Sequence, residues 1–498
     1  MAERESLYNG FNSYSGEPLL WNKFLKISII FLFILVLGGI FGISFTIHPL
    51  VALIFLLGIA LAGVIWYEPA WGLLLVLFVI PLQFLGKINE DGSLTLARIV
   101  TPLVIFIWSL KHLINKDSRL LKSFFNHPIL IAGFIYILST LPSFFNTRNI
   151  SFSIGFLGLK LLPLWLLAVL IVELIRDRIW LFRGYKVILA ISFIVASFGI
   201  YELFTRESIL HLFGMEYYLI SGAKGGELAS TKWESFGEAD VEWVRVASTF
   251  LDPDFFGSYL ILALGFAFGL LFTIKSAFWK GICISFIPIA LVDIVATGSR
   301  SLFLAIFVFF SILLVLVQFR GKWVLLCLLV FMAVAIIPFI QEIVPSFREG
   351  VALSFEEFKK DPRYGFWSTA LNMIFDHPIL GVGLGNFIEV YYNYKADSSI
   401  LTKAYLPHNI VLLVFSETGV MGLIFFTIFV SVVGVTLLKN YCDKSNSDIW
   451  LLNLFIFASF LAYSLFALTS NTLDQEYIWV VCGIIAVLSN LNRLKEKR

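Results

Sequence analysis

Residues 407–438 read PHNIVLLVFSETGVMGLIFFTIFVSVVGVTLL. After Pro407, His408 and Asn409, the run from Ile410 to Leu438 is almost wholly apolar and long enough to cross a bilayer as a helix. The stretch before it, residues 341–407, is polar and interrupts a series of apolar segments. The histidine therefore lies where water, lipid headgroups and bilayer meet, which predicts a membrane protein with a large water-facing insertion.

The composition extends this interpretation to the whole chain. Of 498 residues, 59% are hydrophobic and 14% charged, and the mean hydropathy is +0.90, whereas a soluble domain has about 25% charged residues. Water cannot solvate so much apolar surface, so we expect an all-α polytopic membrane protein. The 52 phenylalanines and 13 tryptophans suit contact with membrane lipids. A net charge of +2 with no dense basic run gives no reason to expect a nucleic-acid partner.

Apolar segments of spanning length predict about 12–14 transmembrane helices. They lie near 25–46, 49–66, 70–86, 97–114, 128–145, 158–175, 184–204, 253–273, 278–297, 300–318, 322–340, 408–438, 449–468 and 475–491. The predicted division is a cytoplasmic tail 1–24, N-terminal helices 25–204, an exoplasmic loop 205–252, central helices 253–340, a large exoplasmic loop 341–407, C-terminal helices 408–491 and a cytoplasmic tail 492–498.

Loop charges predict the orientation of these helices. If the spans alternate, the basic loops all fall on one side, which the positive-inside rule makes cytoplasmic. These loops contain Lys111, Lys116, Arg119 and Lys122; Arg176, Arg178, Arg183 and Lys186; Lys275 and Lys280; Arg320 and Lys322; and Lys439 and Lys444. The exoplasmic face then carries residues 205–252, the turn 297–300 and the insertion 341–407.

Two short amphipathic helices are expected inside the insertion. Residues Pro345 to Lys360 have helical spacing, and Trp367 to Phe375 form a second segment of this kind. The glycines from Gly381 to Gly385 predict a flexible turn, since glycine allows positive φ. We expect the helices to lie along the membrane surface and cover a cavity.

Arginines at the exoplasmic border are candidate anion ligands. Arg300 follows a Thr-Gly-Ser turn at the ends of two helices, and its planar guanidinium suits bidentate contact with phosphate oxygens. A snorkelling role, or pairing with Asp293, is an equally good interpretation of Arg300 alone. Arg245 and Arg363 are further exoplasmic cations, although each by itself is more typical of a solvated loop.

His408 and Glu417 lie at the mouth and in the body of the apolar run 410–438. A histidine can remove a proton from an attacking hydroxyl near neutral pH, but it can also simply bond to a loop. Glu417 can pair with an arginine or polarise a neighbour, while a buried structural hydrogen bond is the commoner role.

A metal or cofactor site has little support in the sequence. Asp252-Pro253-Asp254 has the spacing of a two-carboxylate site for Mg²⁺ or Mn²⁺, but proline at its centre favours a turn. The spacing of the four cysteines matches no zinc site or disulfide framework. The cysteines are Cys283, Cys327, Cys442 and Cys482.

Four blocks in this order resemble the O-antigen ligase and polymerase superfamily. The first is Arg245 with Ser248 to Asp254, and the second is Thr297-Gly298-Ser299-Arg300-Ser301. The third runs from Arg363 through Trp367 to Ile374 and His377 to Phe387. The fourth is His408-Asn409 followed by Glu417-Thr418-Gly419-Val420-Met421-Gly422. Together they span about residues 245–430, and the first seven predicted helices carry no motif of this kind.

The resemblance implies a GT-C-type membrane glycosyltransferase of the bacterial inner membrane. Such enzymes move a glycan from undecaprenyl diphosphate to a lipid A-core, glycan or protein acceptor on the exoplasmic face, without a metal ion or other cofactor. Carried over, His408 activates the acceptor hydroxyl, and Arg300 and Arg245 bind the diphosphate. Arg363, Asn409 and Glu417 complete the expected substrate-binding set.

One departure and two alternatives accompany this resemblance. Asp252 and Asp254 stand where amides are expected, so we predict that they point away from the diphosphate or pair with Arg245. A transporter or flippase of lipid-linked sugars also suits this number of helices, but its ionisable residues should lie near the bilayer midplane. A non-catalytic scaffold would not require His408 and Arg300 to face one cavity.

Overall fold

The computed structural model describes residues 49–82, 96–115, 124–209, 245–250, 252–316, 362–395, 405–472 and 474–496. The chain divides into two compact units, residues 1–68 and 69–498. Helix α2 (Pro49–Tyr67) is the described part of the first unit. The helices expected at 25–46, 322–340 and Pro345–Lys360 lie outside the described residues.

The all-α prediction is confirmed. Eight of the described helical stretches are long and apolar enough to span a membrane, and three shorter apolar helices accompany them. In the N-terminal half of the second unit the helices are α3 (Pro69–Val79), α4 (Leu96–Ile114), α6 (Pro128–Ser139), η1 (Leu141–Asn146), α7 (Ile150–Phe156), η2 (Leu157–Leu161), α8 (Leu162–Leu174) and α9 (Arg178–Thr205). The expected span 158–175 begins earlier, because α7, η2 and α8 form one stretch, Ile150–Leu174.

The remaining helices carry the four motif blocks. They are η3 (Ser248–Phe250), α12 (Pro253–Thr273), α13 (Ala277–Ala296), α14 (Arg300–Leu316), α18 (Pro362–Asp376), α19 (Phe387–Tyr394), α20 (Ile410–Cys442), α21 (Ser447–Ala467) and α22 (Glu476–Glu496). Helix α18 contains the segment expected at 367–375, so that prediction is confirmed, and α19 is an additional helix of the insertion.

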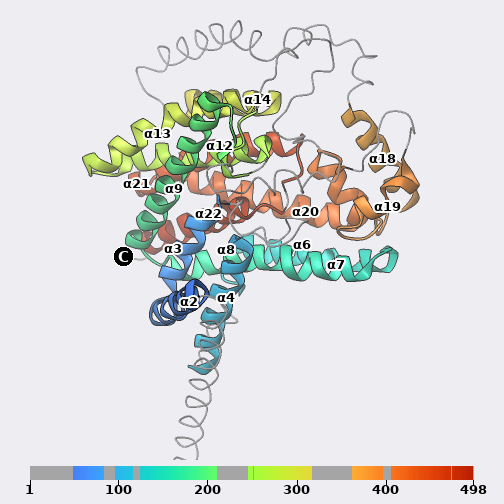
Figure 1. Ribbon diagram of the computed structural model, residues 1–498, viewed down its shortest axis with the longest axis horizontal. Helices are drawn as coiled ribbons and strands as arrows, with labels where there is room; N and C mark the ends of the chain where they lie inside the picture. Colours follow the sequence, from blue (N-terminus) through green and yellow to red (C-terminus); the bar gives the residue numbers. More distant parts are fainter. Residues whose placement is uncertain are drawn as a thin grey trace, which may run out of the picture. The chain divides into compact units, whose positions relative to one another are not determined.

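Helix α12 is the centre of one group of helices. It contacts α9, α13 and α21, and α21 also contacts α14 (Figure 1). Most of its side chains are buried, and a Cβ added at Gly265 would lie 2.3 Å from Ser459 Oγ on α21. Glycine therefore permits the close approach of α12 to α21.

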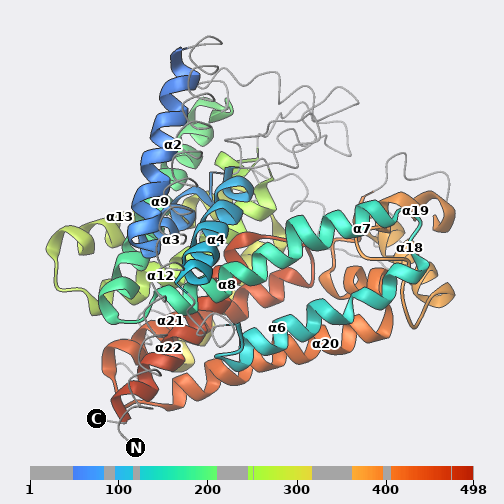
Figure 2. The same cartoon turned by 90° about the horizontal axis from the view of Figure 1, so that it is seen from below.

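A second group extends toward the insertion. Helix α6 lies along α20 and α8 along α22, and α18 and α19 lie at one end of the α6–α20 pair (Figure 2). Gly133 faces Trp165, Phe429 and Trp479, each within 3.5 Å of where a Cβ would stand. Since α6 carries no side chain at this point, the large aromatic rings of three other helices fill the space.

The basic segment at 176–186 differs from the expected loop. Asp177 caps α9, because its Oδ1 accepts a hydrogen bond from the Trp180 N–H at 2.9 Å. Arg183 therefore lies within the helix, 4.5 Å from the Trp180 ring. Arg178 forms an ion pair with Asp448 at 3.7 Å, which joins two segments that the charge pattern assigns to the same membrane side.

Candidate active site

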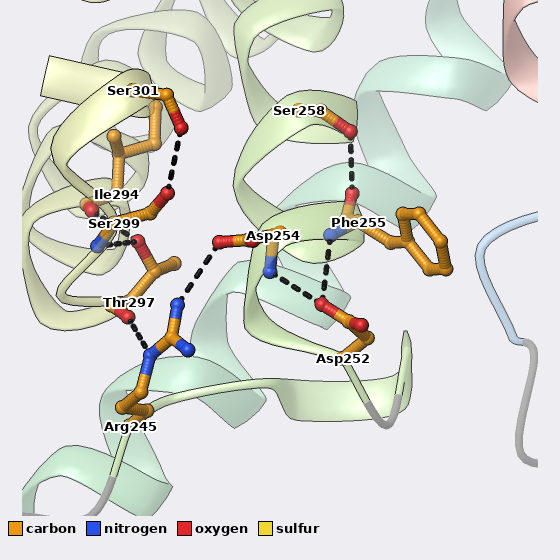
Figure 3. A network of polar contacts seen from close by, with 9 residues as sticks. All are labelled: Arg245, Asp252, Asp254, Phe255, Ser258, Ile294, Thr297, Ser299 and Ser301. Carbon is orange, nitrogen blue, oxygen red and sulfur yellow. Dashed lines mark hydrogen bonds and ion pairs between the residues drawn. The ribbon is translucent and has the colours of Figure 1, made fainter. Parts of the chain in front are cut away.

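Arg245 joins the two blocks that surround the arginine turn. Its Nε donates to the Thr297 carbonyl at 2.6 Å, and its Nη2 contacts Asp254 Oδ1 at 2.9 Å (Figure 3). Thr297 caps the end of α13, and Gly298 reverses the chain with φ 64°. The guanidinium thus ties the turn before α14 to the start of α12.

Arg300 is the first residue of α14 and is exposed. Asp293 lies on the preceding helix α13 and is fully buried, and its carboxylate has no hydrogen-bond partner among the described residues. The alternative in which Asp293 pairs with Arg300 along one helical face is therefore wrong, because the turn at 297–299 separates two helices. Arg300 instead lies three residues after Thr297, whose carbonyl accepts a hydrogen bond from Arg245.

Both aspartates of the Asp-Pro-Asp triplet have structural roles. The predicted pairing of Asp254 with Arg245 is confirmed. Asp252 caps α12, since its Oδ1 accepts from the Asp254 and Phe255 N–H groups at 2.8 and 3.4 Å (Figure 3). Burial, together with the neighbouring Asp254 charge, raises the pKa of Asp252 to about 6. The described residues hold no cluster of three or more side chains that suits a metal ion.

His408 lies at the entrance to α20, beside α18. Its backbone has φ 48°, a left-handed conformation that is uncommon for a residue with a side chain. The half-buried imidazole faces the Phe366 ring with centroids 6.1 Å apart. Arg363 precedes Phe366 by three residues on α18, so the two side chains share one helical face. The third and fourth sequence blocks therefore meet at the histidine.

Asn409 holds the start of α20. Its side-chain oxygen accepts from the Val411 and Leu412 N–H groups at 2.9 and 3.0 Å. Its own N–H donates to Asn471 Oδ1 at 3.2 Å. The amide oxygen expected to contact substrate is thus occupied by capping, which fixes the backbone next to His408.

Glu417 lies at a break in α20 and binds the glycine turn of the insertion. Its Oε2 accepts from the Gly385 N–H at 2.9 Å, and its Oε1 accepts from the Phe387 N–H at 3.2 Å. This is the buried structural hydrogen bonding that is the commoner role for such a residue, although its partners are backbone amides of a loop. The turn expected to be flexible is instead tied to α20.

Two glycines allow the turn and the broken helix to cross. Gly419 has φ 65° and ψ −168°, and a Cβ there would lie 2.1 Å from the Ile379 carbonyl oxygen. Gly381 has φ 71°, and its Cβ would lie 2.4 Å from the Glu417 carbonyl carbon. No side chain fits at either position without moving backbone, so both glycines are needed for this geometry.

The N-terminal helices also hold the glycine turn, although no motif there indicates it. Asn146 Nδ2 donates to the Gly381 carbonyl at 3.0 Å, and Ser153 Oγ donates to the Leu384 carbonyl at 2.7 Å. Asn386 Nδ2 donates to Ser153 Oγ at 2.7 Å. The end of η1 and the start of α7 are therefore part of the support for the site.

The segment between α21 and α22 connects the histidine and arginine positions. It contributes Asn471, which contacts Asn409, and it leads into α22, where the hydroxyl of Tyr477 lies 2.8 Å from Ser258 Oγ. Ser258 follows Asp254 by one turn of α12. His408 and Arg300 thus both lie at the N-terminal ends of their helices, α20 and α14. The short segment between α21 and α22 connects the two regions.

A charged cluster in that segment is not evident from the sequence. Asp474 contacts Arg98 at 3.6 Å and Lys160 at 3.3 Å, and Glu476 contacts Arg98 at 3.5 Å. Arg98 lies in the first turn of α4, and Lys160 lies in η2. Both belong to N-terminal helices that carry no recognisable motif. The one signal for the cluster is the predicted topology, which assigns all four residues to the exoplasmic side.

Comparison with known proteins identifies the segment that carries most of these residues. Residues 284–427 match the family model described as O-antigen ligase. The matched part includes Arg300, Arg363, His408 and Glu417, whereas Arg245 lies before it. A search of curated proteins found no match. Residues 284–427 are thus similar to the O-antigen ligase family, which supports the resemblance of the four sequence blocks.

Proposed function

We propose that this O-antigen ligase- or polymerase-type membrane glycosyltransferase moves a glycan from undecaprenyl diphosphate to an acceptor hydroxyl. The observation that carries the proposal is the arrangement of His408 and the arginine turn at the same ends of their helices, connected through the segment containing Asn471 and Tyr477. A base and a pair of cations at one border of the helices suit transfer from a lipid diphosphate.

Arg300 and Arg245 bind the donor diphosphate in this proposal. The exposed position of Arg300 at the start of α14 leaves it accessible to a lipid-linked substrate. The Nε and Nη2 groups of Arg245 hold the turn, while its Nη1 group is in neither contact and can donate to a phosphate oxygen. Diphosphate is a good leaving group, so it needs charge neutralisation more than protonation.

His408 acts on the acceptor side. The acceptor oxygen attacks the anomeric carbon while its proton passes to the imidazole, and the bond from that carbon to the diphosphate oxygen breaks with its electron pair. The released diphosphate remains on undecaprenol. Attack from the face opposite the leaving group inverts the anomeric configuration, and the step uses no metal ion.

The remaining residues support these groups. Arg363, one turn before the ring that faces His408, binds the carrier phosphate or the acceptor. Asn409 and Glu417 act mainly by fixing the backbone around His408, and the Asn409 Nδ2 group is left to contact the acceptor. An acceptor such as lipid A-core makes the protein a ligase, and a second glycan chain makes it a polymerase.

The active site is proposed to face the exterior of a bacterial cytoplasmic membrane. Cys442, at the opposite end of α20 from His408, is exposed. In spheroplasts an impermeant maleimide should modify a cysteine introduced at Lys395 but modify Cys442 only after permeabilisation. Labelling of Cys442 in sealed spheroplasts contradicts the orientation.

The test of function is a reconstituted transfer assay. Purified protein is mixed with radiolabelled undecaprenyl-diphosphate glycan and, separately, lipid A-core, a second lipid-linked glycan or a hydroxyl-bearing peptide. We expect label to appear in one acceptor class. Movement of intact donor across vesicles with no transfer product would instead indicate a flippase.

A further inference from the structure

A cavity of about 530 Å³ lies far from the candidate active site. It is bounded by the start of α6, the second half of α20 and the end of α22. Helix α20 begins next to His408 and breaks at Gly419. The part from Val420 to Cys442, beyond the break, spans about 35 Å at about 1.5 Å per residue. The cavity therefore belongs to the other ends of these helices.

Two buried side chains that line this cavity carry hydrogen-bond donors with no partner among the described residues. The Asn492 side chain is 2% exposed, and neither its Nδ2 nor its Oδ1 has a partner among the described residues. His127 is 1% exposed, and its Nδ1 accepts from the Ile129 N–H at 3.2 Å. A neutral imidazole with this contact carries its proton on Nε2, and Nε2 also has no partner in the described part of the chain.

The His127 ring remains neutral in this environment. Burial, together with the nearby Arg493 charge, lowers the pKa of His127 to about 4. A buried donor without a partner is costly, usually by about 1–3 kcal/mol. Finding two such groups on one cavity wall indicates that a ligand with acceptor oxygens belongs there.

The charges around the cavity favour an anion. Lys439 and Arg493 line it from the last turns of α20 and α22. Cations at helix C-termini are common by themselves, so the buried neutral donors are the observation that points to a ligand. Asp443 also lines the cavity, but its Oδ1 already accepts from the Ser445 N–H at 3.0 Å.

We propose that this cavity binds the phosphate group of an anionic phospholipid. Lys439 and Arg493 neutralise the headgroup, while His127 and Asn492 donate to its oxygens. Ile428, Val432 and Val435 of α20 form an apolar wall beside these donors, along which an acyl chain can lie. Basic pockets between membrane helices recognise such headgroups in the same way. The inference goes beyond the transferase proposal and does not rest on it.

Native mass spectrometry of the full-length protein in detergent provides the test. The protein is offered equal amounts of dioleoylphosphatidylglycerol and dioleoylphosphatidylcholine. We expect the wild-type protein to retain the anionic lipid, dioleoylphosphatidylglycerol, preferentially. Lys439→Gln combined with Arg493→Gln, both at exposed positions, should weaken its retention about tenfold or more. Asn492→Leu tests the uncharged donor and should also weaken it.

Lys444→Gln is the matched control. Lys444 is an exposed cation just beyond α20 that lies 5.6 Å from the Trp450 ring and does not line the cavity. Retention by this variant should equal that of wild type. Unchanged lipid preference in the double variant, or an equal loss in the control, overturns the proposal.

A second measurement separates lipid from soluble phosphate. The thermal midpoint of delipidated protein is compared in inorganic phosphate and in chloride of matched ionic strength. The contrary result is that phosphate stabilises the protein only when Lys439 and Arg493 are present, while no phosphatidylglycerol is retained. This result would assign the cavity to a soluble phosphate and overturn the lipid assignment.

Discussion

The histidine region (residues 377–391 and 405–420) and the arginine region (residues 245–254 and 294–301) are held together by different interactions. In the histidine region, Glu417 and Asn409 bind backbone N–H groups, so side chains fix the path of the chain. In the arginine region, Arg245 pairs with the Asp254 carboxylate and a carbonyl. The first arrangement orients the proposed base, and the second organises positive charge. This difference suits an acceptor side that depends on geometry and a donor side that depends on charge.

The largest expected effect separates the two regions by function. His408→Ala should lower turnover by about 10²-fold or more, because general-base catalysis contributes about 10²–10⁴-fold. Donor binding should stay close to wild type, since the arginines remain. The control is His377→Gln, which removes a histidine that contacts the Tyr394 hydroxyl within the same region. Near-normal turnover of His408→Ala across pH 6–8 would show that the base is another group.

The next effect concerns the charge of the arginine region. Arg300→Lys keeps the charge but loses the planar fork, so donor affinity should fall about tenfold to a hundredfold, as for the loss of a charge-assisted hydrogen bond. Labelled donor binding to purified protein measures it. Arg176→Lys at an exposed position away from the site is the control. Wild-type affinity and turnover in Arg300→Lys would leave this residue as a snorkelling arginine.

A smaller effect tests the anchoring in the histidine region. Glu417→Gln has one acceptor oxygen left for the Gly385 and Phe387 N–H groups, so unfolding free energy should fall by about 1 kcal/mol. Thermal unfolding in detergent provides the measurement, and Glu389→Gln at an exposed position of α19 is the matched control. If the stability is unchanged while donor affinity drops, Glu417 contacts substrate after all.

The smallest effect is pH-dependent and belongs to the arginine region. The pKa of Asp252 rises from its ordinary value of 3.8 to about 6 in the folded protein. The folded state therefore favours the neutral carboxyl, and this group's contribution to stability is lost as pH rises from about 4 to about 6. Asp252→Asn keeps the helix cap and removes the buried charge, so it should stabilise the protein at pH 7.5 but not at pH 4. Equal effects at both pH values would contradict the shift.

Hydropathy and charge predict much of this fold, because spanning helices need long apolar runs. They also predict that His408 precedes a helix. The pairing of Asp254 with Arg245 is one of the two arrangements expected from the family resemblance. Hydropathy places the start of α9 too late, since Arg183 and Lys186 lie in its first turns and an apolar window excludes them. The division of the chain into membrane and loop segments remains a prediction, and the orientation does as well.

The support of the site is not predictable from the sequence, because it depends on contacts between distant residues. Lys160 and Asp474 are separated by 314 positions, and Ser153 and Leu384 by 231. Gly419 within an apolar run gives no sign that the helix breaks there. Only the crossing of its backbone by Ile379 reveals why a side chain is excluded.

The most direct test of the central claim is the configuration of the new glycosidic bond. Purified wild-type protein is given a lipid diphosphate donor of known anomeric configuration, and the linkage in the product is read by NMR coupling constants. A single displacement with His408 as base predicts an inverted linkage, and the same product should be nearly absent with His408→Ala. A product with retained configuration would contradict the account, because it requires a covalent glycosyl intermediate or a second displacement.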